Sequence, residues 1–178
     1  MPAYAALLRG VNLGARNRVA MADLRALVDG LGGNDVRTYV QSGNVVFRHR
    51  RAAATLEREL AAAIERELGL DVAVLVRTGS QLEKIVKGNP FLRGGADPSS
   101  LHLTLLASMP GAARLRRLRE LDVREGDFTA SGREVYLHLP GGYGRSKLSN
   151  AFFEKHLAVP ATTRNWRTVT ELAELTNE

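Results

Sequence analysis

The sequence contains no cysteine, which excludes disulfide bridges and thiolate chemistry. It also lacks any apolar run near the roughly 20 residues that a membrane-spanning helix needs. Its first residues, MPAYAALLRG, have neither the basic segment nor the small-residue cleavage site of a secretory signal. We therefore expect a cytoplasmic protein that has no membrane partner.

The familiar signatures of catalysis are missing as well. There is no Gly-x-Ser-x-Gly elbow and no His-Glu-x-x-His pair. Acidic residues avoid the glycine-rich loops and gather instead in segments such as LERELAAAIEREL, a pattern typical of a solvated helix face. Paired-carboxylate catalysis and Mg²⁺ capture thus have few candidates, and whether the protein is an enzyme stays open.

Histidine is scarce, and only two of the four histidines suggest a shared site. His102 and His138 fall on segments predicted to be adjacent strands, and strand alternation places both on an outward face. A third ligand is not evident near them, and a structural metal site needs about four ligands. The sequence therefore predicts neither a metal nor a cofactor.

Positive charge is in excess. The 178 residues carry a net charge of +6, and residues up to Arg51 hold 8 arginines against 3 aspartates, or 8 − 3 = +5 of it. A basic surface favours nucleic acid or phosphorylated ligands as partners. The alternative is an ordinary soluble surface with a modest charge.

The first half has the pattern of a βαββαβ unit. Apolar residues recur at helical spacing in two segments, and the second of these ends at Gly69. Short apolar runs on either side of Ser42-Gly43 indicate a hairpin. The pattern predicts strands over residues 4–8, 36–41, 44–48 and 71–76, and helices over 21–31 and 56–68.

The second half repeats this order without an obvious last strand. A linking helix begins after residue 79, where Ser80 and Glu83 form a capping box, and a loop covers residues 91–100. A segment with Trp166 on one helical face takes the place of the final strand. The pattern predicts strands over 101–107, 123–130 and 133–139, and helices over 110–121 and 148–157.

The hairpins of the two halves also correspond, since both turn on Ser-Gly, at Ser42-Gly43 and Ser131-Gly132. The sequence therefore predicts an α+β protein made of two ferredoxin-like (βαββαβ-type) halves with antiparallel sheets and a C-terminal helix. The predicted domains are a ferredoxin-like half over 1–77, a linking helix and loop over 78–100, and a second half with the C-terminal helix over 101–178.

The predicted topology brings two polar loops together. The first two strands of such a unit run parallel because a helix joins them, so the segments RGVNLGARN and QSGN lie at one end of the sheet. We expect an anion to bind there through Arg9, Asn12, Gln41, Ser42 and Asn44. The alternative is a purely structural turn held by asparagine side chains.

A second candidate site is the glycine loop, residues 140–149 of the stretch LPGGYGRSKLSN. Its glycines allow backbone amides to converge, and cations follow at what is predicted to be a helix start. The alternative is a simple strand-to-helix connection. In the later segment TTRNW, an asparagine can line the same site or cap the last helix, which Trp166 anchors. The expected anion-binding residues here are Gly142, Gly144, Arg145, Ser146, Lys147, Arg164 and Asn165.

Five ordered motifs make a family resemblance. The segments ALLRGVNLG, TYVQSGNVVF, NPF, PGGYGRSKL and TTRNWRTV resemble a bacterial family catalogued as domain of unknown function 1697. The resemblance extends from Tyr4 to Leu172. It implies an α+β architecture with two ferredoxin-like halves, and it implies no activity.

Three functions remain open on these grounds. The first is a binding protein for a phosphate-bearing or other anionic ligand, including nucleic acid through contacts from Arg9, Arg16, Arg18, Arg145 and Lys147. The second is an enzyme acting on a phosphorylated or carboxylated small molecule. The third is an interaction module without a small-molecule site. Strands that are apolar on both faces, such as AYAALL, argue against an open sheet platform for RNA.

Overall fold

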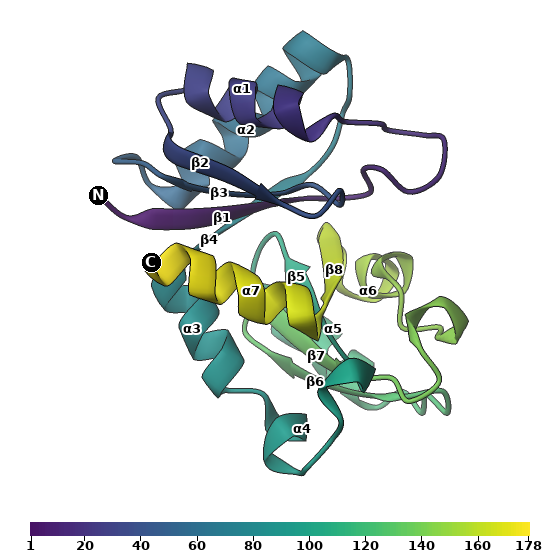
Figure 1. Ribbon diagram of the computed structural model, residues 1–178. Coiled ribbons are helices and arrows are strands. Elements are labelled where there is room, and N and C mark those ends of the chain that lie inside the picture. Colours follow the sequence, from purple (N-terminus) through teal and green to yellow (C-terminus); the bar gives the residue numbers. More distant parts are fainter. The chain divides into compact units, whose positions relative to one another are not determined.

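The computed structural model describes residues 1–178 and contains two four-stranded antiparallel sheets and seven helices (Figure 1). Contacts divide the chain into two compact units, of which one is Met1–Lys84 with Thr170–Glu178 and the other is Ile85–Val169. The domain boundaries expected from the sequence stay a prediction. No helix is long and apolar enough to cross a membrane.

The first unit has the predicted ferredoxin-like topology. Its strands lie in the order β2-β3-β1-β4 with every neighbouring pair antiparallel, and α1 and α2 cover one face of the sheet (Figure 1). The elements are β1 (Ala3–Leu8), α1 (Met21–Gly30), β2 (Asn34–Tyr39), β3 (Asn44–Arg48), α2 (Ala53–Leu68), β4 (Val74–Thr78) and the first part of α3 (Gly79–Lys87).

The core of the first unit follows from two periodicities. Every second residue of β1, such as Ala6 and Leu8, points into the helix-covered cluster. Leu56, Leu60 and Ile64 recur every four residues along α2 and fill the facing stripe. Residues of β1 between them are buried too, so the sheet is covered on both faces, as expected from its apolar strands.

The second unit repeats this fold with the strand order β6-β7-β5-β8. Helices α5 and α6 pack on one face of its sheet, around Leu118, Phe153 and Leu157. The second unit begins with the last residues of α3 and ends with the start of α7 (Trp166–Asn177). Its elements between these are α4 (Pro90–Arg93), β5 (Leu101–Leu106), α5 (Ala112–Arg119), β6 (Asp127–Ser131), β7 (Glu134–His138), α6 (Asn150–Leu157) and β8 (Ala161–Asn165).

Strand β8 corrects the expectation that the second half lacks a last strand. It pairs with β5 along its whole length, and Ala161, which lies opposite Leu106, is fully buried. The sequence concealed this strand because it is only five residues long and mostly polar. A polar side chain such as Thr163 is tolerated on the covered face because its hydroxyl forms a hydrogen bond of 2.7 Å with the hydroxyl of Thr104 on β5.

The two sheets correspond residue by residue at their last strands. Arg77 of β4 lies opposite Ala5, and Arg164 of β8 lies opposite Leu103, at equivalent positions of the ladders. The predicted match between the hairpin turns is wrong in detail. Four residues separate β2 from β3, whereas two separate β6 from β7, so the two Ser-Gly pairs occupy different turn positions.

Three local expectations are also corrected. The capping box of α3 is formed by Thr78 and Gln81, whose side chains accept from each other's backbone N–H at 3.1 and 2.9 Å, because α3 begins two residues earlier than a box at Ser80 and Glu83 would place it. His102 and His138 lie on opposite faces of the second sheet, because His138 pairs with Leu101 instead of His102. The two histidines therefore cannot share a metal ion. The expected loop over 91–100 contains the end of α4 and a 3₁₀ turn.

Candidate functional site

The two polar loops of the first unit do meet, as the topology predicted. The side-chain Nδ2 of Asn12 donates to the backbone oxygen of Gln41 at 2.6 Å. The N–H of Leu8, at the end of β1, donates to the oxygen of Gly43 at 2.9 Å. The loop over residues 9–20 and the turn over residues 40–43 therefore form one surface at this end of the sheet.

Asn12 holds this surface together. Besides the bond to Gln41, its Nδ2 donates to the oxygen of Val19 at 2.9 Å, and its Oδ1 accepts from the N–H of Val19 at 2.8 Å. Its backbone has a φ of 56°, which asparagine tolerates better than other side chains. These bonds use both ends of the amide, so Asn12 acts as a clamp of the loop.

Two other candidate residues of this site, Asn44 and Arg9, also make contacts that stabilise the fold. Asn44 is fully buried, and its Nδ2 donates to the oxygen of Tyr39 at 3.1 Å and to Ser42 Oγ at 2.9 Å. Arg9 is half-buried, and its N–H donates to the oxygen of Ala73. These contacts shape the end of the sheet.

A cavity of about 420 Å³, large enough for a small phosphorylated molecule, opens between these two loops. Arg18 is its cation, and no carboxylate lines it. Ala20, the residue before α1, also lines it and offers no side-chain cap to the first N–H groups of the helix. The lining residues are Asn12, Gly14, Arg18, Val19, Ala20 and Gln41.

The glycine loop of the second unit differs from its prediction. Tyr143–Arg145 form a 3₁₀ turn, and α6 begins only at Asn150. The N-cap of α6 is Ser149, whose Oγ accepts from the N–H of Phe152, while Ser146 Oγ accepts from the N–H of Leu148. The cations therefore do not stand at a helix start, because buried Leu148 carries the chain inward before the helix begins.

A cavity of about 470 Å³ lies beside this loop, and its charges are mixed. Gly142 and Arg145 line it, together with Arg124. The expectation that carboxylates avoid the loop is wrong in three dimensions, because Glu125, just before β6, and Asp127, its first residue, belong to the lining. Gly144, Ser146 and Lys147 lie outside the lining, and Lys147 is exposed.

The remaining two candidates belong to β8 and its junction with α7. Arg164 is buried, and its Nη1 donates to Thr162 Oγ1 at 2.7 Å and to the oxygen of Thr163 at 3.0 Å. Burial lowers the pKa of Arg164 to about 10, an effect that the neighbouring Tyr143 opposes. Asn165 caps α7, since its Oδ1 accepts from the N–H of Thr168 at 2.8 Å. Arg164 is therefore committed to contacts within the protein, and the Oδ1 of the exposed Asn165 is committed to the helix cap.

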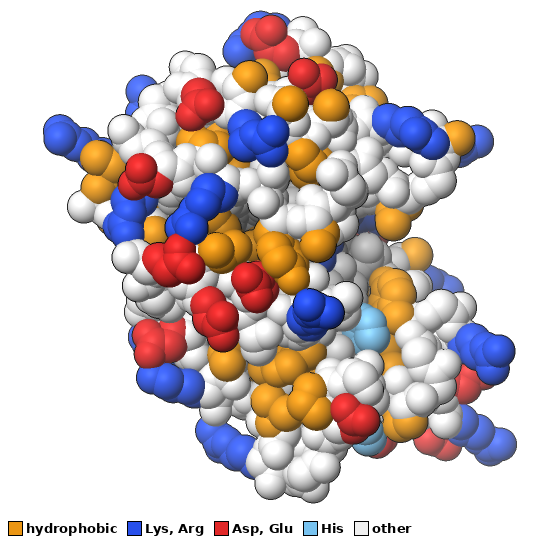
Figure 2. Space-filling view, in the orientation of Figure 1, with side chains coloured by type: hydrophobic (Ala, Val, Ile, Leu, Met, Phe, Trp, Pro, Cys, Tyr) orange, Lys and Arg blue, Asp and Glu red, His pale blue; other side chains and the backbone are white.

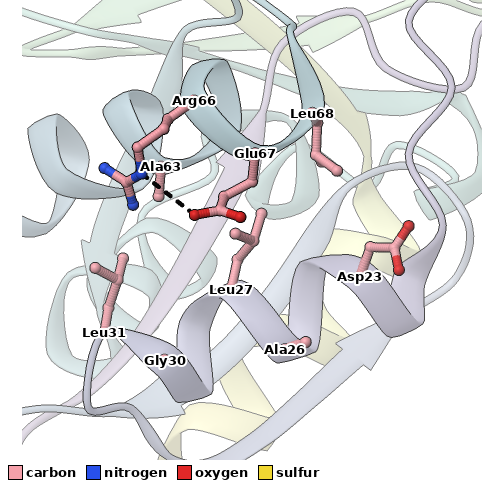
Figure 3. Close-up of a pocket in the computed structure, with 9 residues that line it drawn as sticks. All are labelled: Asp23, Ala26, Leu27, Gly30, Leu31, Ala63, Arg66, Glu67 and Leu68. Atoms are coloured by element: carbon pink, nitrogen blue, oxygen red, sulfur yellow. Dashed lines mark hydrogen bonds and ion pairs between the residues drawn. The ribbon is translucent and has the colours of Figure 1, made fainter.

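Helices α1 and α2 form a further groove, of about 460 Å³, that the sequence did not indicate (Figure 3). Leu27, Leu31 and Leu68 contribute apolar surface. The charges nearest its centre, Arg66 and Glu67, form an ion pair with an N–O distance of 3.2 Å. This groove offers no unpaired cation to an anion.

His102 is a functional candidate that the sequence pattern did not indicate, because it was expected on an outward face. Its ring stacks on Tyr143 of the glycine loop at a centroid distance of 5.3 Å, and its buried Nδ1 has no hydrogen-bond partner. Partial burial lowers the pKa of the imidazole. The signal was the alternation of β5, which places His102 on the face covered by α6. No group of three metal-ligating side chains occurs in the structure.

Comparison with known proteins identifies a similar structure and a family. The conserved bacterial protein SP0830 from Streptococcus pneumoniae has a similar structure, with a TM-score of 0.74, 19% sequence identity and coverage of 98% of each chain. At this identity the likeness concerns the fold alone. No curated protein matches the sequence. The model of the family described as "Protein of unknown function (DUF1697)" matches residues 1–136, and the chain therefore belongs to this family.

Proposed function

We propose that this protein binds a small phosphate-bearing or other anionic ligand in the cavity between loop 9–20 and turn 40–43 of the first unit. The observation that carries the proposal is the chemistry of the lining, in which Arg18 and amide groups face a cavity without any carboxylate. An arginine fork forms charge-assisted hydrogen bonds with phosphate or carboxylate oxygens. The N–H groups at the start of α1, which no side chain caps, add a partial positive charge, and Asp23 in the first turn offsets part of it.

The glycine loop is the weaker of the two candidate sites. Its cavity sets Arg124 and Arg145 against Glu125 and Asp127, so the nearby carboxylates offset the positive field. Its helix is already capped by Ser149. An anion therefore gains less electrostatic stabilisation there than beside Arg18.

A small anion also fits better than nucleic acid. Base stacking requires exposed aromatic rings, and none of the large exposed apolar side chains is aromatic. Contacts with nucleic acid would then be restricted to phosphates, and affinity would fall steeply with salt. Arg16 and Arg18 are exposed and suit that role, so an oligonucleotide is the natural competitor in the test.

Titration of the whole chain with inorganic phosphate by calorimetry tests the proposal. Replacement Arg18→Gln removes the charge and should weaken phosphate binding by about 1–3 kcal/mol, the usual contribution of a hydrogen bond to a charged group. Arg58→Gln is the matched control, because Arg58 is an exposed arginine of the same unit on α2, outside the cavity.

Arg145→Ala decides between the two candidate sites. We expect it to leave phosphate affinity unchanged. Loss of binding in this variant, with Arg18→Gln behaving like the parent, would move the site to the glycine loop. An absence of phosphate binding at low salt would remove both cavities as anion sites.

A further inference from the structure

We infer that the end of the first unit formed by loop 9–20 and turn 40–43 is a docking surface for an anionic lipid bilayer, into which Leu13 and Val40 insert. This inference rests on the proposed function only in that Arg18 would bind a lipid phosphate in place of a soluble one. The sequence predicted no membrane partner because it has no spanning segment, but a peripheral surface does not require one.

Two large aliphatic side chains are exposed on the two loops that meet at this end. Leu13 is 69% exposed and Val40 is 51% exposed. Each stands one residue from the hydrogen bond that joins Asn12 to Gln41, so both lie on the rim of the same cavity. Single exposed apolar residues are common on soluble proteins, but here two occur on loops that a hydrogen bond joins, so one end of the unit presents both.

The backbone at Val40 is strained. Its φ is 51°, a left-handed conformation that β-branched side chains rarely adopt. Asparagine or glycine would occupy this turn position at lower cost. A strained residue that also exposes an apolar side chain suggests a role beyond folding.

The charges around the two tips complement an anionic surface. Arg16 and Arg18 are exposed on the same loop as Leu13, and residues 1–22 contain no carboxylate. The carboxylates closest to the two tips along the chain are Asp23, in the first turn of α1, and Asp35 of β2, which forms an ion pair with Arg48 at 3.6 Å. In Figure 2 Lys and Arg side chains stand beside apolar ones where this loop protrudes.

Three features favour a bilayer over other polyanions. The tips are aliphatic and so insert into acyl chains but do not stack on bases. Loop 9–20 protrudes from the first unit, as Figure 1 shows, which suits entry into a soft surface. The net charge of +6 attracts the chain to anionic headgroups at long range.

The test is sedimentation of the full chain with vesicles of equimolar phosphatidylcholine and phosphatidylglycerol, compared with vesicles of phosphatidylcholine alone. Leu13→Ser should weaken binding to the anionic vesicles about tenfold, the effect of burying roughly half of a leucine side chain. Arg18→Gln should weaken it about fivefold. Val40→Asn should also reduce vesicle binding while leaving the fold at least as stable, because asparagine tolerates the left-handed backbone.

Met109→Ser is the matched control, because Met109 is 64% exposed but belongs to the second unit. It should bind vesicles like the parent. A tryptophan at the tip, Leu13→Trp, should shift its fluorescence to the blue on anionic vesicles, whereas Met109→Trp should not. The natural Trp166 is buried and supplies a constant background.

Unchanged vesicle binding in Leu13→Ser and Val40→Asn would overturn the inference. So would equal binding to neutral vesicles, or displacement by a duplex oligonucleotide that depends on Arg18 but not on Leu13. Phosphate binding in calorimetry without any vesicle binding would leave the proposed function intact and refute the bilayer alone. Vesicle binding that needs Leu13 while free phosphate does not bind would support the bilayer and refute the cavity as a soluble-anion site.

Discussion

Replacement of Asn12 tests whether one side chain organises the candidate site. Its amide makes three hydrogen bonds, two with Val19 and one with Gln41, at 2.6 to 2.9 Å. Glycine at this position keeps the backbone conformation and removes only the side chain. At a net value of about 1 kcal/mol for each bond, reduced for the partly exposed ones, Asn12→Gly should lower the free energy of unfolding by about 2–3 kcal/mol.

Two further variants separate the contributions. Asn12→Ala should cost about 1 kcal/mol more than Asn12→Gly, because alanine at a φ of 56° suffers the left-handed penalty. Asn17→Gly is the matched control, since Asn17 has a φ of 51° but its side chain makes a single exposed bond, of 3.3 Å to the oxygen of Gly10. The control should cost about 0.5 kcal/mol or less.

Urea unfolding followed by circular dichroism measures these differences, and a second transition from the other unit would be fitted separately. The Val19 N–H donates to Asn12 Oδ1, so its rate of hydrogen exchange directly reports how stably the loop is held. Phosphate affinity should fall in Asn12→Gly, because the loop would be less ordered before binding and the entropy cost of ordering it would reduce the binding free energy. Equal stabilities of Asn12→Gly and Asn17→Gly, with unchanged exchange at Val19, would refute the clamp.

Three other predictions follow from local geometry. Gly43→Ala should destabilise the first unit by at least about 2 kcal/mol in urea unfolding, because an added Cβ would lie 2.5 Å from Cγ2 of Val11 at a φ of 77°; Gly69→Ala, with open space around it, should cost only about 1 kcal/mol, and equal losses would contradict this. An NMR titration should give His102 a pKa below its ordinary 6.5; because burial favours the neutral ring, its contribution to stability is complete above pH 6.5 and declines as the pH falls through the lowered pKa, a dependence that His102→Gln should abolish. Asn165→Ala should lower stability by about 1 kcal/mol through loss of the α7 cap, and a neutral result would assign that helix start to packing of its neighbours alone.

Local patterns in the sequence were sufficient for most of the fold. Apolar spacing located α1 and α2, and Gly69 ended α2 in the left-handed conformation that glycine favours. Handedness and connection rules then placed loop 9–20 beside turn 40–43, because a helix between two strands forces them to run parallel. These features depend on short-range interactions and simple topology, which one sequence contains.

Only the tertiary structure decided what the polar residues do. Asn12, Asn44 and Asn165 look alike as candidate ligands in the sequence, but hydrogen bonds with backbone groups turn them into structural supports, across 29 residues for Asn12 and within five for the other two. The carboxylates near the glycine loop come from a segment some fifteen residues earlier, and β8 becomes a strand because its threonine hydroxyls find partners across the sheet. Burial and pairing depend on long-range contacts, so no local pattern could distinguish a ligand-binding amide from a clamp.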